Sequence, residues 1–161
     1  MLPVEGGLLL LIIIANGAPV VAARLFGGWG GRPLDGGWML ADGQRLLGDA
    51  KTWRGVLAAM LATGLGAVLL NWPIGVGIII GLAAMLGDVL SSFIKRRLGL
   101  DSSSQSVGLD QIPEALLPLL AVAETFALGG LTIAMIVGGF AVLELTLSPL
   151  FYWLGIRNRP Y

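Results

Sequence analysis

Acidic, basic and hydroxyl side chains share one short apolar stretch, LGDVLSSFIKRR at residues 86–97. At about 100° per residue in a helix, four of them fall within about a third of the circumference. These four residues are Asp88, Ser92, Lys95 and Arg96. A charge inside a membrane helix costs at least ~2.5 kcal/mol, so Asp88 needs a partner or an aqueous cavity. A salt bridge that ends the helix would supply a partner, but the added hydroxyl and the excess positive charge favour a binding site.

Polar residues also gather immediately before or within other apolar runs. The segment LLGDAKTWRG, residues 46–55, contains four of them: Asp49, Lys51, Thr52 and Arg54. The segment GLDQIPE places Asp110 before a later apolar run, where capping of a helix is the alternative to a binding role. In ANGAPV, Pro19 interrupts helical hydrogen bonding, which either frees backbone carbonyls near Asn16 or simply kinks the helix. We expect Arg97, which points away from Asp88, to reach lipid headgroups.

The residue types restrict the chemistry that this chain can perform. It contains no cysteine and no histidine, which excludes disulfides, thiolate nucleophiles, His–Cys zinc sites and a histidine general base. It also lacks a P-loop, a dinucleotide fingerprint and a kinase signature. Several cations beside at least two carboxylates, which could share a hard divalent cation, suit a polyphosphate bound with Mg²⁺.

The elements that must position these residues are membrane helices. Hydrophobic residues make up 56% of the chain and charged residues only 12%, about half of the charged share of a soluble domain. We predict an all-α, polytopic integral membrane protein that forms a single transmembrane domain over residues 1–161. Five segments approach the length that crosses a bilayer. They are residues 2–26, 55–71, 74–97, 112–128 and 131–154, separated by tight turns at NWP and GG and by two long polar loops.

The positions of the ten lysines and arginines predict an orientation. They lie in or beside the first long loop, at the border of the second, and in the C-terminal tail at Arg157 and Arg159. With five crossings all of these regions share one side, which the positive-inside rule assigns to the cytoplasm. We therefore expect a multi-pass protein of the cell membrane with its N-terminus outside, its C-terminus cytoplasmic and its active site facing the cytoplasm. Basic loops that only set topology would explain the cations but not the carboxylates among them.

Taken together, the motifs resemble the CDP-diacylglycerol synthases, or phosphatidate cytidylyltransferases. GDVLSSFIKRR is similar to the Gly-Asp and Ser-x-x-Lys-Arg signature of that family, GLD at 108–110 resembles the end of the signature, and KTWRG resembles its Lys-Thr-Trp-Glu-Gly stretch. The chain is much shorter than the bacterial members, has Asp101–Ser102 where Lys-Asp is usual, and lacks their Pro-Gly-His-Gly-Gly run. These departures, with ANGAPV, DGQRLLGDAKTWRG and DQIPE, resemble the archaeal branch, the CDP-archaeol synthases, over nearly the whole chain.

This resemblance implies a reaction and its partners. CTP and unsaturated archaetidic acid, 2,3-bis-O-(geranylgeranyl)-sn-glycerol 1-phosphate, would give CDP-unsaturated archaeol and pyrophosphate, with Mg²⁺ required. The lipid phosphate is already anionic at pH 7, so no histidine or cysteine has to activate it. Metal and Lys/Arg clamps would offset the repulsion between the two polyanions. The implied partners are CTP, an ether-linked isoprenoid lipid and the bilayer, with no nucleic acid; the sequence does not fix an oligomeric state.

The resemblance also implies roles for individual residues. The expected catalytic residues are Asp88, Lys95, Arg96 and Asp110, and the two aspartates are the expected metal ligands, with Asp49 in reserve. The expected nucleotide- and phosphate-binding residues are Asn16, Lys51, Thr52, Arg54, Ser92, Lys95 and Arg96. Lys51 and Arg54 would hold either the triphosphate or the lipid phosphate, and Asn16 would read cytosine. We expect Glu124 and Glu144, which lie in predicted membrane helices far from the bases, to be buried polar packing residues.

Three other interpretations remain open at this point. The same transfer to diacyl phosphatidic acid would need identical head-group chemistry, and charged residues say nothing about lipid tails. A small anion transporter could use Asp88, Glu124 and Glu144 as a relay, although the sequence has no convincing inverted repeat and its polar residues crowd one side. A membrane-embedded structural subunit would need these charges only for folding or assembly.

Overall fold

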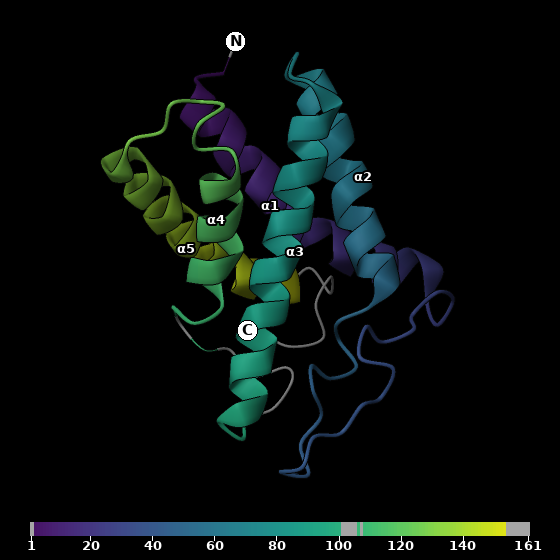
Figure 1. Cartoon of the computed structure of the whole chain (residues 1–161). Helices are drawn as coiled ribbons and strands as arrows, with labels where there is room; N and C mark the ends of the chain where they lie inside the picture. Colours follow the sequence, from purple (N-terminus) through teal and green to yellow (C-terminus); the bar gives the residue numbers. More distant parts are fainter. Residues whose placement is uncertain (1, 101–105, 107, 154–161) are drawn as a thin grey trace.

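The chain folds into five α-helices joined by two long loops and two short connections (Figure 1). The computed structural model describes residues 2–100, 106 and 108–153, with side chains up to residue 146. Its helices are α1 (Val4–Phe26), α2 (Trp53–Leu69), α3 (Ile74–Arg97), α4 (Gln111–Ala121) and α5 (Gly130–Trp153). The described residues contain two isolated β-bridges and no strand, which confirms the all-α prediction. Arg157, Arg159, Asp101, Ser102 and the predicted helix end at residue 154 lie outside the described residues.

Local sequence explains where the first three helices begin and end. α2 begins at Trp53 because the preceding Thr52 accepts a hydrogen bond from the backbone N–H of Gly55 at 3.2 Å. α3 ends before Gly99, whose φ of 70° lets the chain turn back so that the N–H of Leu100 reaches the carbonyl of Lys95 at 3.0 Å. α1 continues through Pro19 to Phe26, so the expected interruption of this helix is limited to the one backbone hydrogen bond that proline cannot donate.

α4 is shorter than the predicted helix of residues 112–128, because it ends at Ala121, and its first turn lies beside the middle of α3. A Cβ atom on Gly87 would lie 2.2 Å from the carbonyl oxygen of Pro113, so the first turn of α4 packs directly against the centre of α3. The start of α4 therefore lies about ten residues, roughly 15 Å of helix length, before the end of α3. α4 then needs only 11 residues before the turns that follow Ala121.

α2 and α3 approach closely through small residues. A Cβ atom on Gly77 would lie 2.2 Å from the carbonyl oxygen of Thr63, and one on Gly81 would lie 2.4 Å from its hydroxyl oxygen. The hydroxyl itself donates to the carbonyl of Ala59 at 2.7 Å within α2. Small residues allow this kind of backbone contact between helices in a bilayer, where packing replaces the hydrophobic effect as the driving force.

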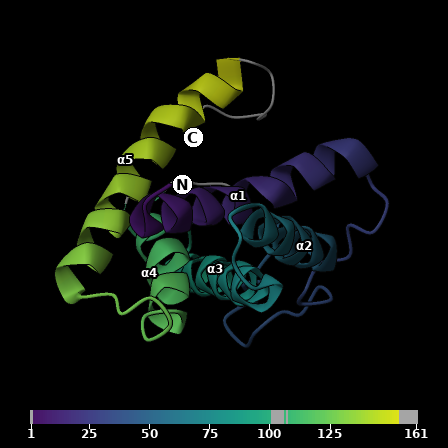
Figure 2. The ribbon, with the colours of Figure 1, turned by 90° about the horizontal axis from the view of Figure 1, so that it is seen from above.

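α1 and α5 cross the other three helices. Seen from above in Figure 2, α2, α3 and α4 are viewed nearly end-on, whereas α1 and α5 extend across the view. The apolar core gathers where α1, α3, α4 and α5 meet, and includes Leu8, Leu11, Ile80, Leu119 and Phe140. Trp72 and Phe126 pack against this core, with their ring centroids 4.6 Å apart. This contact connects the α2–α3 turn to the segment that follows α4.

Two helices, α1 and α3, are long and apolar enough to cross a membrane. α2 and the described part of α5 are apolar but shorter. Leu57, Leu61 and Leu65, spaced by four residues along α2, are exposed and form an apolar stripe on its outer face. Such a stripe fits contact with lipid. Length and composition thus support α1 and α3 as spans, and the number of five crossings stays a prediction.

Candidate functional site

The chain contains two lysines, and each forms an ion pair with an aspartate from a different segment. Lys51, at the end of the first long loop, contacts Asp88 in the middle of α3. Lys95, two turns farther along α3, lies 2.7 Å from the carboxylate of Asp110, which precedes α4. The two pairs bring together four of the residues that the sequence singled out, from three separate parts of the chain.

Two glutamates join this cluster, and the sequence interpretation missed the first of them. Glu114, in the first turn of α4, is buried and hydrogen-bonded to Asp88. Two carboxyl groups can share a hydrogen bond only if one of them carries a proton. Glu144 of α5, which was expected to lie far from the bases, interacts electrostatically with Glu114 and so belongs to the surroundings of the site. The four-residue spacing from Asp110 to Glu114 was the available signal, because it places both on one helical face.

The other unexplained acid, Glu124, is not part of the site. It was expected inside a membrane helix, but it lies in the turns after α4 and is exposed. The difference follows from the early end of α4 at Ala121. Glu124 therefore needs no buried partner.

The charge state of Lys51 follows from its neighbours. Burial alone would lower the pKa of its ammonium group. The carboxylate of Asp88 opposes that effect, helped by Glu114 and Asp110, and the pKa of Lys51 rises above its ordinary value. Lys51 is therefore a cation throughout the physiological pH range and is available to an anionic ligand.

The first long loop is a folded unit that carries Lys51 to the site. Its central residue is Asp35, whose side chain is fully buried and pairs with Arg45 at 2.8 Å. The same carboxylate accepts three backbone N–H groups, from Gly37, Leu47 and Gly48, at 3.0–3.1 Å. Burial alone would raise the pKa of Asp35, but the Arg45 guanidinium and the three N–H groups outweigh it and hold the pKa well below its usual range.

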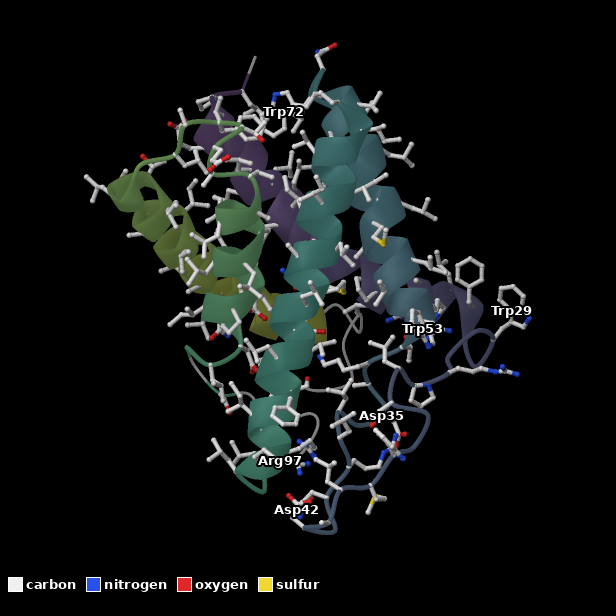
Figure 3. The ribbon with its side chains drawn as sticks, viewed as in Figure 1. Trp29, Asp35, Asp42, Trp53, Trp72 and Arg97 are labelled. Carbon is white, nitrogen blue, oxygen red and sulfur yellow. The ribbon has the colours of Figure 1, made fainter. Side chains whose placement is uncertain are left out.

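Further hydrogen bonds connect this loop to the backbone of Lys51 and to the end of α3. The N–H of Leu34 donates to the carbonyl of Lys51 at 2.7 Å, so the residue beside Asp35 is bonded directly to the backbone of the lysine. Arg97 of α3 donates to the carboxylate of Asp42 and to the carbonyl of Arg45, both at 2.6 Å. Figure 3 shows Asp35, Asp42 and Arg97 together at the lower end of the molecule. The expectation that Arg97 reaches lipid headgroups is therefore wrong, because the loop occupies its guanidinium.

Two of the predicted site residues have partners elsewhere. The guanidinium of Arg54 donates to the carbonyls of Gly27 and Trp29, both at 2.7 Å. These bonds connect the first turn of α2 to the segment that follows α1. Asp49, the reserve metal ligand, is 83% exposed and pairs with Arg45 at 2.9 Å. The structure does not bring either side chain to the lysine–aspartate pairs.

Asn16, the residue expected to read cytosine, is not among the residues that line the pocket beside Lys51, although Pro19 of the same helix is. Pro19, Thr52, Met85 and Asp88 line this pocket together with Lys51. The side-chain amide of Asn16, three residues before Pro19, donates to the carbonyl of Ile12 within α1 at 3.0 Å. Thr52 is engaged as the cap of α2. Contact of these residues with a nucleotide stays a prediction.

Buried hydrogen-bond donors without partners surround the second ion pair. Within the described part of the chain, no partner exists for the hydroxyl of Ser92, for two nitrogens of Arg96 or for the amide nitrogen of Gln111. These side chains are 2%, 9% and 1% exposed, respectively. Asp110 does not cap α4, since its carboxylate accepts instead from the N–H of Ser106 at 3.1 Å. A surplus of buried donors indicates a site for an acceptor-rich anion, because unpaired buried donors are costly.

The donor atoms present fit a magnesium ion shared with a bound phosphate. No group of three or more histidine, cysteine, aspartate or glutamate side chains is arranged as a complete metal site among residues 2–100, 106 and 108–153. Mg²⁺ is, however, usually held by one or two carboxylates, with waters and substrate phosphates completing its shell. Asp88 and Asp110 offer such carboxylates, and both already face a cation. They are the residues that would hold the ion.

Comparisons with known proteins identify a family. The family model described as "CarS-like: CDP-archaeol synthase" matches residues 8–161. The CDP-archaeol synthase of Methanopyrus kandleri is 49% identical over 98 residues, which cover 57% of this chain and 56% of that protein. The CDP-archaeol synthase of Thermococcus kodakarensis is 34% identical over 150 residues, covering 86% and 80%. A solved structure described as "an intramembrane enzyme for archaeal membrane lipids biosynthesis" is 34% identical, with a TM-score of 0.73 over 87% of this chain and 89% of that one.

Proposed function

The chain belongs to the CDP-archaeol synthase family, and from this membership we propose that it transfers CMP from CTP to unsaturated archaetidic acid. It is an enzyme of the CTP-dependent nucleotidyltransferase class and a membrane protein, and its lipid product would be CDP-unsaturated archaeol. One observation carries the proposal at the level of the site. Two partly buried lysine–aspartate pairs lie near unpartnered donors on α3 and α4, where a nucleoside triphosphate and a lipid phosphate could meet.

The proposed reaction requires binding and charge neutralisation more than proton transfer. An anionic oxygen of the lipid phosphate attacks the α-phosphorus of CTP and forms the new P–O bond. The bond between the α-phosphorus and the oxygen that bridges to the β-phosphate breaks, and pyrophosphate leaves with its electron pair. Bound Mg²⁺, held by Asp88 and Asp110, would neutralise phosphate charge. Lys95 and Arg96 would bind the phosphates of CTP, and Ser92 would donate a hydrogen bond to them.

The lysine–aspartate pairs prepare the lysines for this role. An ammonium group has three donors, so Lys51 and Lys95 can keep their carboxylate partners and still donate to a phosphate oxygen. The carboxylates hold each cation in place before substrate arrives, which limits the reorganisation needed during the reaction. Lys51 lies at the pocket formed by α1, α2, α3 and the first loop, whereas Lys95 faces α4. We propose that they bind different phosphates.

The distribution of charge supports a cytoplasmic active site. The described lysines and arginines lie in the first loop and at the ends of α1, α2 and α3 that share one end of the molecule in Figure 1. The other end, which contains the N-terminus and the α2–α3 turn, carries none in its described part. By the positive-inside rule the basic end faces the cytoplasm. The isoprenoid chains of the lipid would remain in the bilayer and reach the site from the side.

The function is tested by offering different lipids to the purified protein. The protein is incubated with radiolabelled CTP, Mg²⁺ and one of three acceptors: unsaturated archaetidic acid, its saturated form, or diacyl phosphatidic acid. We expect labelled CDP-lipid with the unsaturated ether lipid at the highest kcat/KM. Preference for the diacyl lipid would contradict the proposed substrate, and equal rates with both ether lipids would contradict the preference for unsaturated chains. Flux of phosphate into vesicles without CTP turnover would indicate a transporter instead.

A further inference from the structure

Gln111, the first residue of α4, is buried but leaves most of the hydrogen-bonding capacity of its side chain unused among the described residues. Its side chain is 1% exposed. The side-chain oxygen accepts from the backbone N–H of Gly108 at 2.7 Å, but the amide nitrogen has no partner among the described residues. Leaving a buried donor unpaired costs about 1–3 kcal/mol. A ligand that accepts hydrogen bonds would remove this cost.

The hydrogen bond to Gly108 fixes which way the amide faces. Because the oxygen is bonded to the turn before α4, the NH₂ group must point away from that turn. Gly108 has a φ of 84°, a conformation that suits glycine and holds its N–H toward Gln111. Gln111 therefore presents the two N–H donors of its amide to whatever lies beyond it.

Gln111 lies between the two lysine–aspartate pairs. Its neighbour in sequence, Asp110, pairs with Lys95. One turn farther along the same buried face of α4, Glu114 bonds to Asp88. The close contact of the first turn of α4 with Gly87 brings this face directly against α3. The unpartnered nitrogen thus belongs to the region where the proposed substrates would meet.

Neighbouring donors in the same state indicate the chemistry of the missing acceptor. Ser92 and Arg96, on the face of α3 that carries Lys95, also have buried donors without partners in the described residues. A phosphoryl group has only acceptor oxygens and can receive several such donors at once. The exocyclic amino group of cytosine, in contrast, is itself a donor and needs an acceptor, whereas the unpartnered atom of Gln111 is a donor nitrogen. The donor set therefore fits a phosphate and not the amino edge of the base.

We propose that Gln111 is a substrate-binding residue whose side-chain nitrogen donates a hydrogen bond to a phosphoryl oxygen. The proposal rests on the proposed function for the identity of the ligand, which is either a phosphate of CTP or the phosphate of the lipid. The same chemistry serves both, and the kinetics separate them. Loss of the donor raises the KM for the substrate that it contacts and leaves the other KM unchanged.

The first test compares Gln111→Glu with a matched control. This substitution keeps an oxygen for the N–H of Gly108 and nearly the same shape, but it replaces the donor with a group that repels phosphate. We expect one KM to rise about 10- to 100-fold, the factor for a lost hydrogen bond to a charged group, at an unchanged melting temperature. Gln44→Glu, at an exposed position of the first loop, adds the same charge and should leave both KM values unchanged. Unchanged KM values in a folded Gln111→Glu and a folded Gln111→Met would overturn the proposal and leave only a structural role in the turn.

A second test uses the wild-type protein and does not depend on a variant at position 111. The chain contains three glutamines, at 44, 105 and 111, so selective ¹⁵N-glutamine labelling gives three side-chain amide signals. Gln44→Glu and Gln105→Glu assign the first two. On addition of pyrophosphate, CTP or the lipid phosphate, we expect the Gln111 signal to shift and its exchange with water to slow. A signal that none of the three ligands changes would reject the proposal. A shift with pyrophosphate in a protein that fails to transfer CMP would retain the phosphate site while rejecting the proposed function.

Discussion

Each lysine side chain in this protein pairs with an aspartate, and this arrangement determines what single substitutions do. A largely buried ion pair contributes little net stability, but removal of one partner leaves the other charge uncompensated. Such removal typically costs about 3–5 kcal/mol. The two pairs nevertheless differ, since Lys51–Asp88 joins a loop to the middle of a helix, whereas Lys95–Asp110 joins neighbouring helices. Conservative changes are therefore needed to separate catalysis from folding.

Replacement of Asp88 by asparagine tests its proposed role in catalysis. Asparagine keeps the shape and can still accept a hydrogen bond from Lys51, but it removes the negative charge that would hold a metal ion. We expect kcat to fall at least about 100-fold, the scale seen when one group that stabilises transition-state charge is removed. Asp49→Asn, at an exposed position, provides the matched control and should retain full activity. Near-normal turnover of Asp88→Asn would show that its assigned role is wrong.

Substitutions of Arg54 and Lys51 distinguish a residue that stabilises the first loop from one that binds substrate. Arg54 is occupied by the carbonyls of Gly27 and Trp29, whereas Lys51 faces the pocket. We therefore expect Arg54→Ala to lower the melting temperature with at most a few-fold change in KM, while Lys51→Ala raises a KM by at least about tenfold. Steady-state kinetics and thermal unfolding of both variants measure this difference. A large KM effect of Arg54→Ala in a stable protein would instead support direct phosphate binding.

Spacing within one helix predicted part of this site, but contacts across the chain were not predictable. Asp88, Ser92, Lys95 and Arg96 share a face because helical geometry requires it. The pairing of Lys51 with Asp88 spans 37 positions and depends on how the first loop folds. Glu114 had a usable signal in its spacing from Asp110, whereas nothing in the sequence near Glu144 indicates its electrostatic interaction with Glu114.

At the scale of elements, the first loop depends on Asp35. This carboxylate organises the loop through Arg45 and three backbone N–H groups, and the loop in turn bonds to the backbone of Lys51 through Leu34. A loop stabilised in this way differs from a flexible lid, because its buried ion pair has to break before the loop can unfold. The position of Lys51 therefore depends on a residue that never has to touch substrate.

The lowered pKa of Asp35 predicts how the loop responds to acid. A carboxyl group whose folded pKa lies below its unfolded value of about 3.9 contributes stability above that pH. This stability is lost progressively as the pH falls from about 4 toward the folded pKa. We expect the fluorescence of loop residue Trp38 to report an acid transition that starts below about pH 4 in the wild type. In Asp35→Asn the loop should already be open at neutral pH, and an identical acid transition in that variant would contradict the role of Asp35.

The contact between α3 and α4 depends on Gly87. A Cβ atom there would meet the backbone of Pro113 at 2.2 Å, so Gly87→Ala must separate the helices that carry Asp88 and Asp110. We expect a destabilisation of about 1–3 kcal/mol, as for other overpacked contacts, and a clear loss of activity. Gly75→Ala, in the same helix but with open space around its Cβ position, is the control and should preserve both. Thermal unfolding and kcat measurements compare the two.

Four of the five helices were predicted from hydropathy to within two residues at each end. Apolar runs bounded by proline, glycine and polar clusters are sufficient for that, since both bilayer length and helix ends are local properties. α4 was predicted too long because the apolar run continues to residue 128, and hydropathy does not reveal that this helix starts halfway along α3. The contact of Gly87 with Pro113 shows where α4 starts along α3.

At the scale of the whole molecule, the described lysines and arginines lie at one end. This distribution predicts that the first loop faces the cytoplasm and the turns after α4 face outside. The chain has no cysteine, so a single introduced cysteine can be labelled without background. Ala41→Cys in the first loop and Thr125→Cys in the turns after α4 both substitute exposed residues. We expect a membrane-impermeant maleimide to label position 125 in intact cells and position 41 only after permeabilisation. Labelling of both positions from the same side would contradict the proposed orientation.

The central claim is that this site joins the α-phosphate of CTP to a lipid phosphate. The most direct measurement compares CTP labelled in the α-phosphate with CTP labelled in the γ-phosphate, in otherwise identical reactions with Mg²⁺ and unsaturated archaetidic acid. We predict that the α-label enters the lipid fraction and the γ-label appears in pyrophosphate in equal molar amounts. Recovery of the γ-label in the lipid, or of neither label outside CTP, would contradict the account.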